Sequence, residues 1–394
     1  MNNNKQMSSG KQTLARKLVL GVSVIMLGIG CSKPNDNHDL RNFKQVNLVA
    51  NLSKYHPVTI DPTLINGFGL AWSPSGTAWV NSVGGHVSEL YSGEGAIVRT
   101  GINIPSPADT IGGLPCGIVF SGGKGFNLSN GPSVFLFGGF DGVLSGWNPA
   151  SGNNAKRLKN PPNAVYTGLA TATSNGRNLV YGANFGANKI DVWDTAFVPV
   201  AMSFKDPTIP AGYAPYNIQA VADKIFVMYA RLGADGHFVT GNGEGFISSF
   251  NTNGTFIKRF ASKGTLNVPW GITVAPASFL VNDDLDLSEI NAGTHSQISN
   301  GEDNNDPREG NNNNQIKDPV ILVGNFGDGR INVFSVDGLY LGQLKSHNHP
   351  IVIDGLWALS FPPATATAID PDRLYFTAGP EHETDGLFGY LIKQ

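Results

Sequence analysis

One short pattern recurs six times along this chain, and it limits the possible folds more than any other feature. Each copy is a strand-like run that ends in an aromatic residue: Tyr91, Trp147, Trp193, Phe250, Phe334 and Tyr390. Most copies lie 46 to 57 residues apart, and one interval measures 84 residues. A repeat with this period is typical of folds that copy one small unit many times.

Each repeat unit contains four strand-like runs. A run that usually opens with glycine comes first, as in "GLAWSP", and a run such as "NLVYGANF" is second. The aromatic run is third, and the fourth is a run such as "TFIKRF" or, in the third unit, Pro199–Phe204. The runs are rich in β-branched and aromatic residues and are bounded by turn residues, as strands are. We therefore predict an all-β fold, a six-bladed β-propeller with four-stranded blades over residues 43–394.

Two segments depart from the repeat. The sixth unit lacks a fourth run, and we expect the N-terminal run Phe43–Leu52 to complete this blade and close the ring, which removes open sheet edges. The long interval contains an Asn/Asp-rich insertion at residues 282–317, in blade five. Its low apolar content predicts a solvated loop. A calcium site is the less favoured interpretation, because the acidic residues do not follow the spacing of a known calcium loop.

The N-terminus has the features of an export signal. Residues 1–30 combine early lysines and an arginine with an apolar run of 13 residues, which is too short to span a bilayer comfortably. The run ends at "LGIGCSKP", which resembles a bacterial lipoprotein signal with Cys31 as the lipidated residue, although an ordinary cleaved signal remains the alternative. We expect an exported protein with a polar tether at residues 31–42. Its N-terminal lipid would hold it in a membrane, on the periplasmic side of the outer membrane or at the cell surface.

The composition excludes several functions. Only 14% of the residues are charged, the net charge is −3, and no basic run follows the N-terminus, so nucleic acid is a poor partner. The sequence contains no G-x-S-x-G, HExxH, P-loop or C-x-x-C motif, and nucleophilic serine catalysis therefore has no support. We expect a monomer.

The loops predict where a site would lie. In a propeller, the loops between the second and third strands share one face with the loops that lead to the next blade. That face gathers polar residues around the mouth of the central channel: Asn81, Asn184, Asn217, Asn325, Asp328, Asp354, His349, Glu381 and His382. Amide and carboxylate oxygens suit a divalent cation such as calcium, and a His beside carboxylates suits a transition metal or acid–base work. The alternative is that the Asn and Gly residues serve the turns themselves.

Two resemblances bear on this interpretation. Six-bladed propellers of the gluconolactonase type hold a divalent ion at the channel mouth, but they use a Glu from the first inner strand, and "GLAWSP" has none. The chain also resembles an uncharacterised bacterial family of exported propellers, many with a PEP-CTERM sorting signal. The motifs that carry this resemblance are "DPTLINGFGLAWSP", "DGVLSGWNP", "DPTIPAGYAPYNIQ", "PWGITVAPASF", "VGNFGDGRINVF" and "IDGLWALSF". This chain ends at "GYLIKQ" without that signal, and the family implies no activity.

The residues favour a non-catalytic module at the cell envelope that binds a small molecule, a glycan or a protein. The long loop at residues 231–245 is the expected contact. The alternative is a metal-dependent hydrolase of the lactonase or esterase kind, with its site at the channel mouth.

Overall fold

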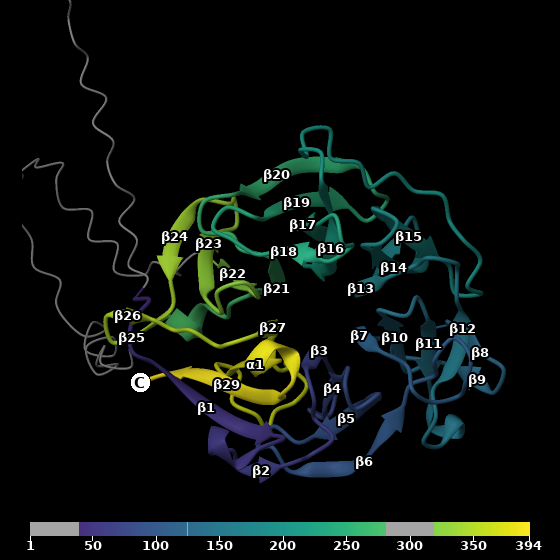
Figure 1. Ribbon diagram of the computed structural model, residues 1–394, viewed down its shortest axis with the longest axis horizontal. Coiled ribbons are helices and arrows are strands. Elements are labelled where there is room, and N and C mark those ends of the chain that lie inside the picture. The colour runs from purple at the N-terminus through teal and green to yellow at the C-terminus, as the bar shows by residue number, and fades with distance from the viewer. Residues whose placement is uncertain (1–38, 124, 281–318) are drawn as a thin grey trace, which may run out of the picture. The chain divides into compact units, whose positions relative to one another are not determined.

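The strands of the six repeat units form six separate sheets, each built mainly from consecutive strands of one unit (Figure 1). The computed structural model describes residues 39–123, 125–280 and 319–394. Blade one contains β3 (Gly67–Trp72), β4 (Ala78–Ser82), β5 (Val87–Tyr91) and β6 (Ile97–Asn103). Blade two contains β7 (Pro115–Phe120), β10 (Phe135–Gly139), β11 (Leu144–Trp147) and β12 (Lys156–Lys159). Blade three contains β13 (Tyr166–Ser174), β14 (Arg177–Asn184) and β15 (Lys189–Trp193).

The remaining three blades contain the later strands and the first two. Blade four contains β16 (Tyr213–Val221), β17 (Lys224–Leu232), β18 (Phe238–Val239), β19 (Phe246–Asn251) and β20 (Phe256–Ser262). Blade five contains β21 (Pro269–Val274), β22 (Val320–Asn325), β23 (Ile331–Ser335) and β24 (Tyr340–Gln343). Blade six contains β27 (Leu356–Ser360), β28 (Leu374–Ala378), β29 (Leu387–Lys393), β1 (Phe43–Ala50) and β2 (Thr59–Ile60).

Short elements occupy the loops. They are the hairpins β8 (Asn127–Leu128) with β9 (Gly131–Pro132) and β25 (Lys345–Ser346) with β26 (His349–Pro350), the single turns η1 (Ser53–Tyr55), η2 (Pro149–Ser151) and η3 (Ala277–Leu280), and the turn α1 (Pro380–Glu383).

The first strands of the six blades form an inner ring. Each of β3, β7, β13, β16 and β21 contacts the first strand of the next blade, and β27 contacts β3. This arrangement confirms the predicted six-bladed propeller. Glycines let the inner strands approach so closely: a Cβ on Gly117 would lie 2.5 Å from the backbone nitrogen of Leu169, and one on Gly271 would lie 2.6 Å from the carbonyl oxygen of Trp357.

The chain's first strand lies in the same sheet as its last one. Strand β1 pairs antiparallel with β29, with Val46 opposite Tyr390. Phe43, Val49 and Ala50 of β1 are buried. The contact between β1 and β29 therefore joins two segments from opposite ends of the sequence.

Blade three differs from the prediction, because its sheet ends at β15. The prediction of a fourth strand at Pro199–Phe204 is wrong. One bridge forms, between Trp193 and Pro199, and the segment then leaves the strand edge. Phe204 packs between Tyr181 of β14 and Phe250 of blade four, with ring centroids 5.6 and 5.4 Å apart, and this packing holds the segment away from β15.

Several predictions fall outside the described residues. These are the signal at residues 1–30, lipidation of Cys31, most of the tether at residues 31–42, and the insertion at residues 282–317. Over the ranges that are described, no helix has the length and apolar character needed to cross a membrane.

Candidate functional site

Aromatic side chains fill one end of the central channel. Phe68, Tyr216, Trp270 and Trp357 lie near the start of four inner strands, and all are buried. Phe68 stacks on Trp357 with ring centroids 3.8 Å apart. The indole nitrogens are bonded as well: Trp357 Nε1 donates to Asn66 at 2.8 Å and Trp270 Nε1 donates to the Thr167 carbonyl at 3.0 Å. We call these residues and the loop aromatics that pack on them the aromatic plug.

The repeated phrase "NFG" contributes to this plug. Phe185 and Phe326 of the two "NFG" copies directly follow the second strands of blades three and five, and Phe140 of "GFD" follows that of blade two. All three pack in the same hydrophobic cluster as Trp357. Phe326 stacks on Trp357 at 4.0 Å, and Phe238 from the blade-four loop packs edge-on against Phe326 at 5.1 Å. The phrase recurs because several blades each place one ring into the plug.

Two of the predicted site residues link neighbouring blades. Asn81 donates from Nδ2 to the carbonyls of Cys116 and Gly117 on the next inner strand, at 3.0 and 3.3 Å. Asn217 donates from Nδ2 to the Trp270 carbonyl at 2.7 Å, and its Oδ1 accepts from the Ile218 backbone. Both side chains are buried. The Asn81 amide therefore links the second strand of blade one to the inner strand of blade two, and the Asn217 amide links two inner strands.

Asn184, Asn325 and Asp328 belong to the turns after the second strands. Asn184 Oδ1 accepts from the backbone of Val165 and Ala187, and its Nδ2 donates to a neighbouring carboxylate. Asn325 Nδ2 donates to the Thr265 carbonyl at 2.7 Å and to Asp328 Oδ1 at 3.0 Å. The bonds to Ala187 and Asp328 lie within the turns, and the bonds to Val165 and Thr265 join each turn to a neighbouring loop.

The other predicted residues lie in the loop between β28 and β29 of blade six or in the segment that leads into β27. Asp354 is exposed, and its Oδ2 accepts the Glu381 backbone N–H at 2.9 Å. Glu381 also pairs with Lys54 at 3.5 Å, while His349 and His382 are exposed. Within the described ranges, no three His, Cys, Asp or Glu side chains gather closely enough to hold a metal ion. A divalent ion at the mouth stays a prediction.

Glu383 flanks His382 together with Glu381 in the predicted His and carboxylate cluster, and it is the residue of this loop that bonds to Asn66 beside the plug. Residues 381–383 all have positive φ angles, of 54°, 56° and 68°, and form a left-handed turn. Glu383 Oε2 accepts from Asn66 Nδ2 at 2.8 Å, and the same amide accepts from Trp357. Burial raises the pKa of Glu383, while Asn66 and the charge of His237 lower it. The sequence indicated the cluster, but not the left-handed turn that brings Glu383 to Asn66.

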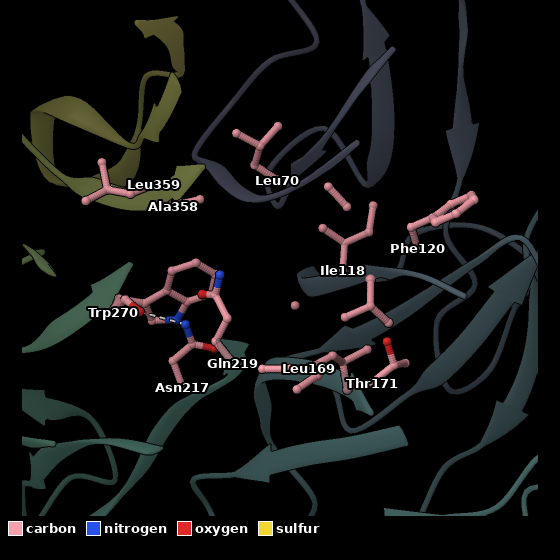
Figure 2. A pocket seen from close by; sticks show the side chains of 15 residues that line it. Leu70, Ile118, Phe120, Leu169, Thr171, Asn217, Gln219, Trp270, Ala358 and Leu359 are labelled. Carbon is pink, nitrogen blue, oxygen red and sulfur yellow. Dashed lines mark hydrogen bonds between the residues drawn. The ribbon is translucent and has the colours of Figure 1, made fainter. Parts of the chain in front are cut away.

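A cavity of about 250 Å³ lies in the channel beyond the plug (Figure 2). It is formed mainly by the C-terminal halves of the inner strands, and all six blades contribute to its wall. Leu70, Gln219 and Thr171 line it and are half-exposed, so this end is open to solvent. The cavity therefore lies on the side of the plug away from the mouth at which the site was predicted.

Most of the side chains that line the cavity are apolar, among them Ile118, Leu169 and Leu359, although polar atoms make up more of its exposed wall than apolar atoms. None of the described residues that line it is ionisable. Asn217 and Trp270 form part of the wall with their polar groups already bonded. Gln219 and Thr171 have no hydrogen bond to another described side chain or to the described backbone, so they are the free polar groups. The sequence did not single them out, because their strands β13 and β16 contain other polar residues, such as Thr167 and Asn217.

Comparison with known proteins finds relatives without an established activity. The chain is 31% identical over 296 residues to an uncharacterised protein of Acanthamoeba polyphaga mimivirus, which covers 71% of this chain and 67% of that protein. It is 34% identical over 238 residues to a second uncharacterised mimivirus protein, of which it spans about half, 48%. No family model matches the chain. These relatives are viral, and they give no support to the bacterial origin or the PEP-CTERM link that the sequence resemblance implied.

Solved structures of other propellers are similar at low identity. A streptogramin B lyase is 12% identical with a TM-score of 0.47, covering 90% of this chain and 98% of that one. A gluconolactonase from Xanthomonas campestris is 12% identical with a TM-score of 0.45, covering 84% and 86%. Likenesses of this size carry no argument about function.

Proposed function

We propose a small-molecule-binding role for this chain, which belongs to the family of the mimivirus protein that is 31% identical to it. The observation that carries the proposal is the channel cavity, whose wall comes from all six blades and whose described lining residues include no ionisable one. Acid–base catalysis needs a titratable group within reach of the substrate, and the described part of this wall offers none. Binding by shape and by a few neutral polar contacts is what such a wall supports.

The size and chemistry of the cavity define the ligand class. An apolar cavity of about 150 Å³ holds benzene, so a cavity of about 250 Å³ suits a ring that carries one polar substituent. The free amide of Gln219 offers donors and an acceptor side by side, which complements a neutral carboxamide or lactam. We therefore expect an uncharged, mostly apolar molecule with one amide-type edge.

The test uses benzamide and toluene as probes, because they share the ring and differ in the amide. Benzamide should bind saturably in ligand-observed NMR. Gln219→Leu should lower the affinity for benzamide about fivefold, the effect of losing one net hydrogen bond. Toluene binding should change little. Ala220→Phe, at the half-exposed rim, fills the cavity and should abolish both signals. Binding that survives Ala220→Phe would place the ligand elsewhere and reject the proposal.

A second candidate is the metal-dependent hydrolase at the channel mouth. It is favoured by the buried Oδ1 atoms of Asn81 and Asn325, which have no hydrogen-bond partner among the described residues and which a hard cation such as calcium would satisfy. Glu383, with its raised pKa, would be the acid. A thermal shift with calcium, manganese or zinc that a chelator reverses, together with ester hydrolysis lost in Glu383→Gln, is the expected result. Unchanged melting with every metal rejects it.

We also propose that the protein is exported and anchored through a lipid on Cys31, in line with the exported bacterial propellers that it resembles. The "LGIGCSKP" run supports this. Expression in a bacterial host with labelled palmitate should label the chain, and Cys31→Ala should remove the label and release the protein from membranes. Equal labelling of Cys31→Ala would contradict the anchor.

A glycan or protein partner at the loop of residues 231–245 is the remaining proposal, and shortening that loop tests it.

A further inference from the structure

Blade three has a gap beside its third strand, at the place where the segment after β15 leaves the blade. Val200 of this segment still donates to the Val192 carbonyl at 2.8 Å, so the end of β15 is covered. A gap of about 520 Å³ opens between the start of β15, the departing segment and blade four. None of its described lining residues lines the channel cavity, so the gap is a separate place on the molecule.

The break in the repeat creates this gap. A regular fourth strand would run along the whole of β15 and occupy the same space. Instead, the Phe204 ring packs between Tyr181 and Phe250, with centroids 5.6 and 5.4 Å away, and turns the segment from the start of β15. Departures from an otherwise consistent pattern are expected at functional sites.

Most of the side chains around the gap are apolar or aromatic. Met202, Phe204 and Tyr213 line it and pack against the core between blades three and four, but they stay half-exposed. Polar and apolar atoms share the exposed wall about equally. A concave site of about 300 to 1,000 Å³, with apolar side chains and a few polar groups, is the usual form of a small-molecule site. The gap therefore has the size and the wall chemistry of a ligand site.

The charges in the wall favour an anion. Lys205 lines the gap and is exposed, and no described carboxylate lies within ion-pair distance of it. Lys189 also lines the gap and pairs with Asp191 at 2.7 Å, yet 57% of its side chain stays in solvent. The carboxylate of Asp206 in the wall is neutralised by Arg259 at 2.5 Å. The described wall therefore presents unbalanced positive charge.

One buried donor in the wall lacks an acceptor. Tyr229 lines the gap and is only 3% exposed, and its hydroxyl has no hydrogen-bond partner among the described residues. A buried polar group without a partner is rare in a folded protein and needs an explanation. An oxygen atom of a molecule bound in the gap would be such an acceptor.

We propose that the gap binds a small organic acid with an aromatic body, of the arylalkanoate class. The ring of the ligand packs on Phe204 and Tyr213, and its carboxylate is held by Lys205 and Lys189. An inorganic anion would leave the apolar side chains uncovered, and a neutral ring would leave Lys205 without a counter-charge. A molecule that joins a ring to a carboxylate complements both parts of the wall.

The experiment uses the whole chain with phenylpropionate and phenylpropionamide, which share the ring and differ in charge. The acid should bind saturably in ligand-observed NMR. At low salt its affinity should exceed that of the amide by up to about fivefold, the effect of pairing with exposed lysines. The difference should shrink as salt is added, because salt screens exposed charges. Equal affinities at low salt, or no binding of the acid, would overturn the proposal.

Two tryptophan variants show whether the compounds bind in the gap. Ala211→Trp places a large ring at the exposed rim and should abolish binding of both compounds. Ala201→Trp, at an exposed residue outside the described lining of the gap, should preserve it. Ala211→Trp should leave benzamide binding in the channel cavity unchanged, so the two sites are tested separately. Binding of the acid that survives Ala211→Trp rejects the gap as the site.

A lysine variant tests the charge and changes only an exposed side chain, so it decides the matter even if Ala211→Trp does not fold. Lys205→Gln should remove most of the preference for the acid over the amide. Lys224→Gln, at an exposed lysine outside the described lining of the gap, should keep that preference. An unchanged preference in Lys205→Gln is the result that contradicts the proposal.

Discussion

A buried pair of carboxyl groups in blade one shares a single hydroxyl. Thr63 Oγ1 lies 2.6 Å from Asp61 Oδ1 and 2.6 Å from Glu89 Oε1. One hydroxyl carries one proton, so the second short contact requires a proton on a carboxyl group. Burial, with a smaller effect from the charge of Asp61, raises the pKa of Glu89. Because its pKa is raised, Glu89 holds a proton more readily than an exposed Glu does, and we expect it to carry the shared proton.

This protonation makes stability depend on pH. The folded chain holds the Glu89 proton more tightly than the unfolded chain, so stability is full below the unfolded pKa and falls as pH rises through the folded one. Glu89→Gln keeps the hydrogen bond without the ionisation. Its free energy of unfolding should fall less between pH 5 and pH 8 than that of the parent, by up to about 1.4 kcal/mol for each pH unit of the transition.

Urea denaturation at several pH values measures this difference. Asp223→Asn, at an exposed carboxylate, serves as the control and should keep the slope of the parent. Parallel curves for the parent and Glu89→Gln would show that Glu89 is ionised in the folded state.

Inner strands are held to one another by side chains as well as by packing. Asn217 links β16 to the Trp270 carbonyl of β21, and both of its polar atoms are bonded. Asn217→Ala would leave the buried Trp270 carbonyl without this donor. We expect a loss of about 1 to 3 kcal/mol in the free energy of unfolding. Chemical denaturation checks it, and Asn253→Ala, on an exposed turn, should lose about 0.5 kcal/mol or less. Equal losses would mean that the link between the blades contributes nothing.

The strands themselves were predictable because each is a local pattern that the chain repeats six times. The fourth strand of blade three was not, since Pro199–Phe204 alternates like a strand in sequence. The segment does not continue as a strand because the Phe204 ring packs against Tyr181 and Phe250, which belong to two different blades. A contact of that kind joins residues far apart in sequence, and no local pattern reports it.

The candidate site was predicted less well than the fold. We predicted Asn81, Asn184, Asn217 and Asn325 around one mouth of the channel, and in the structure their amides bond to turns and neighbouring strands. One end of the channel is filled because aromatic side chains from several blades pack together there. Their combined volume depends on the assembled fold and cannot be read from any one repeat unit. The predicted mouth is therefore the plugged end, and the cavity lies beyond it.

At the scale of the molecule, the pairing of β1 with β29 is the feature that would complete the last blade. We predict that a chain starting after residue 52 loses stability against one starting at residue 39, because Phe43, Leu48 and Val49 would no longer be buried. At about 1.5 to 3 kcal/mol for each buried side chain, the Tm should fall by about 10 °C or more. The exposed edge of β29 should also promote association.

Calorimetry and light scattering measure these two effects. A synthetic peptide of residues 43–52 should restore the Tm when added in excess, and a scrambled peptide should not. An unchanged Tm in the shortened chain would show that β1 is not needed to complete the ring.

The aromatic plug also has a kinetic consequence. The rings around Trp357 separate the mouth from the cavity, so no ligand can pass along the axis of the propeller from one end to the other. A ligand bound in the cavity must therefore leave by the end at which it entered. A second ligand can therefore bind only after the first has dissociated. The residence time of the bound ligand then limits the rate at which ligands exchange in the cavity.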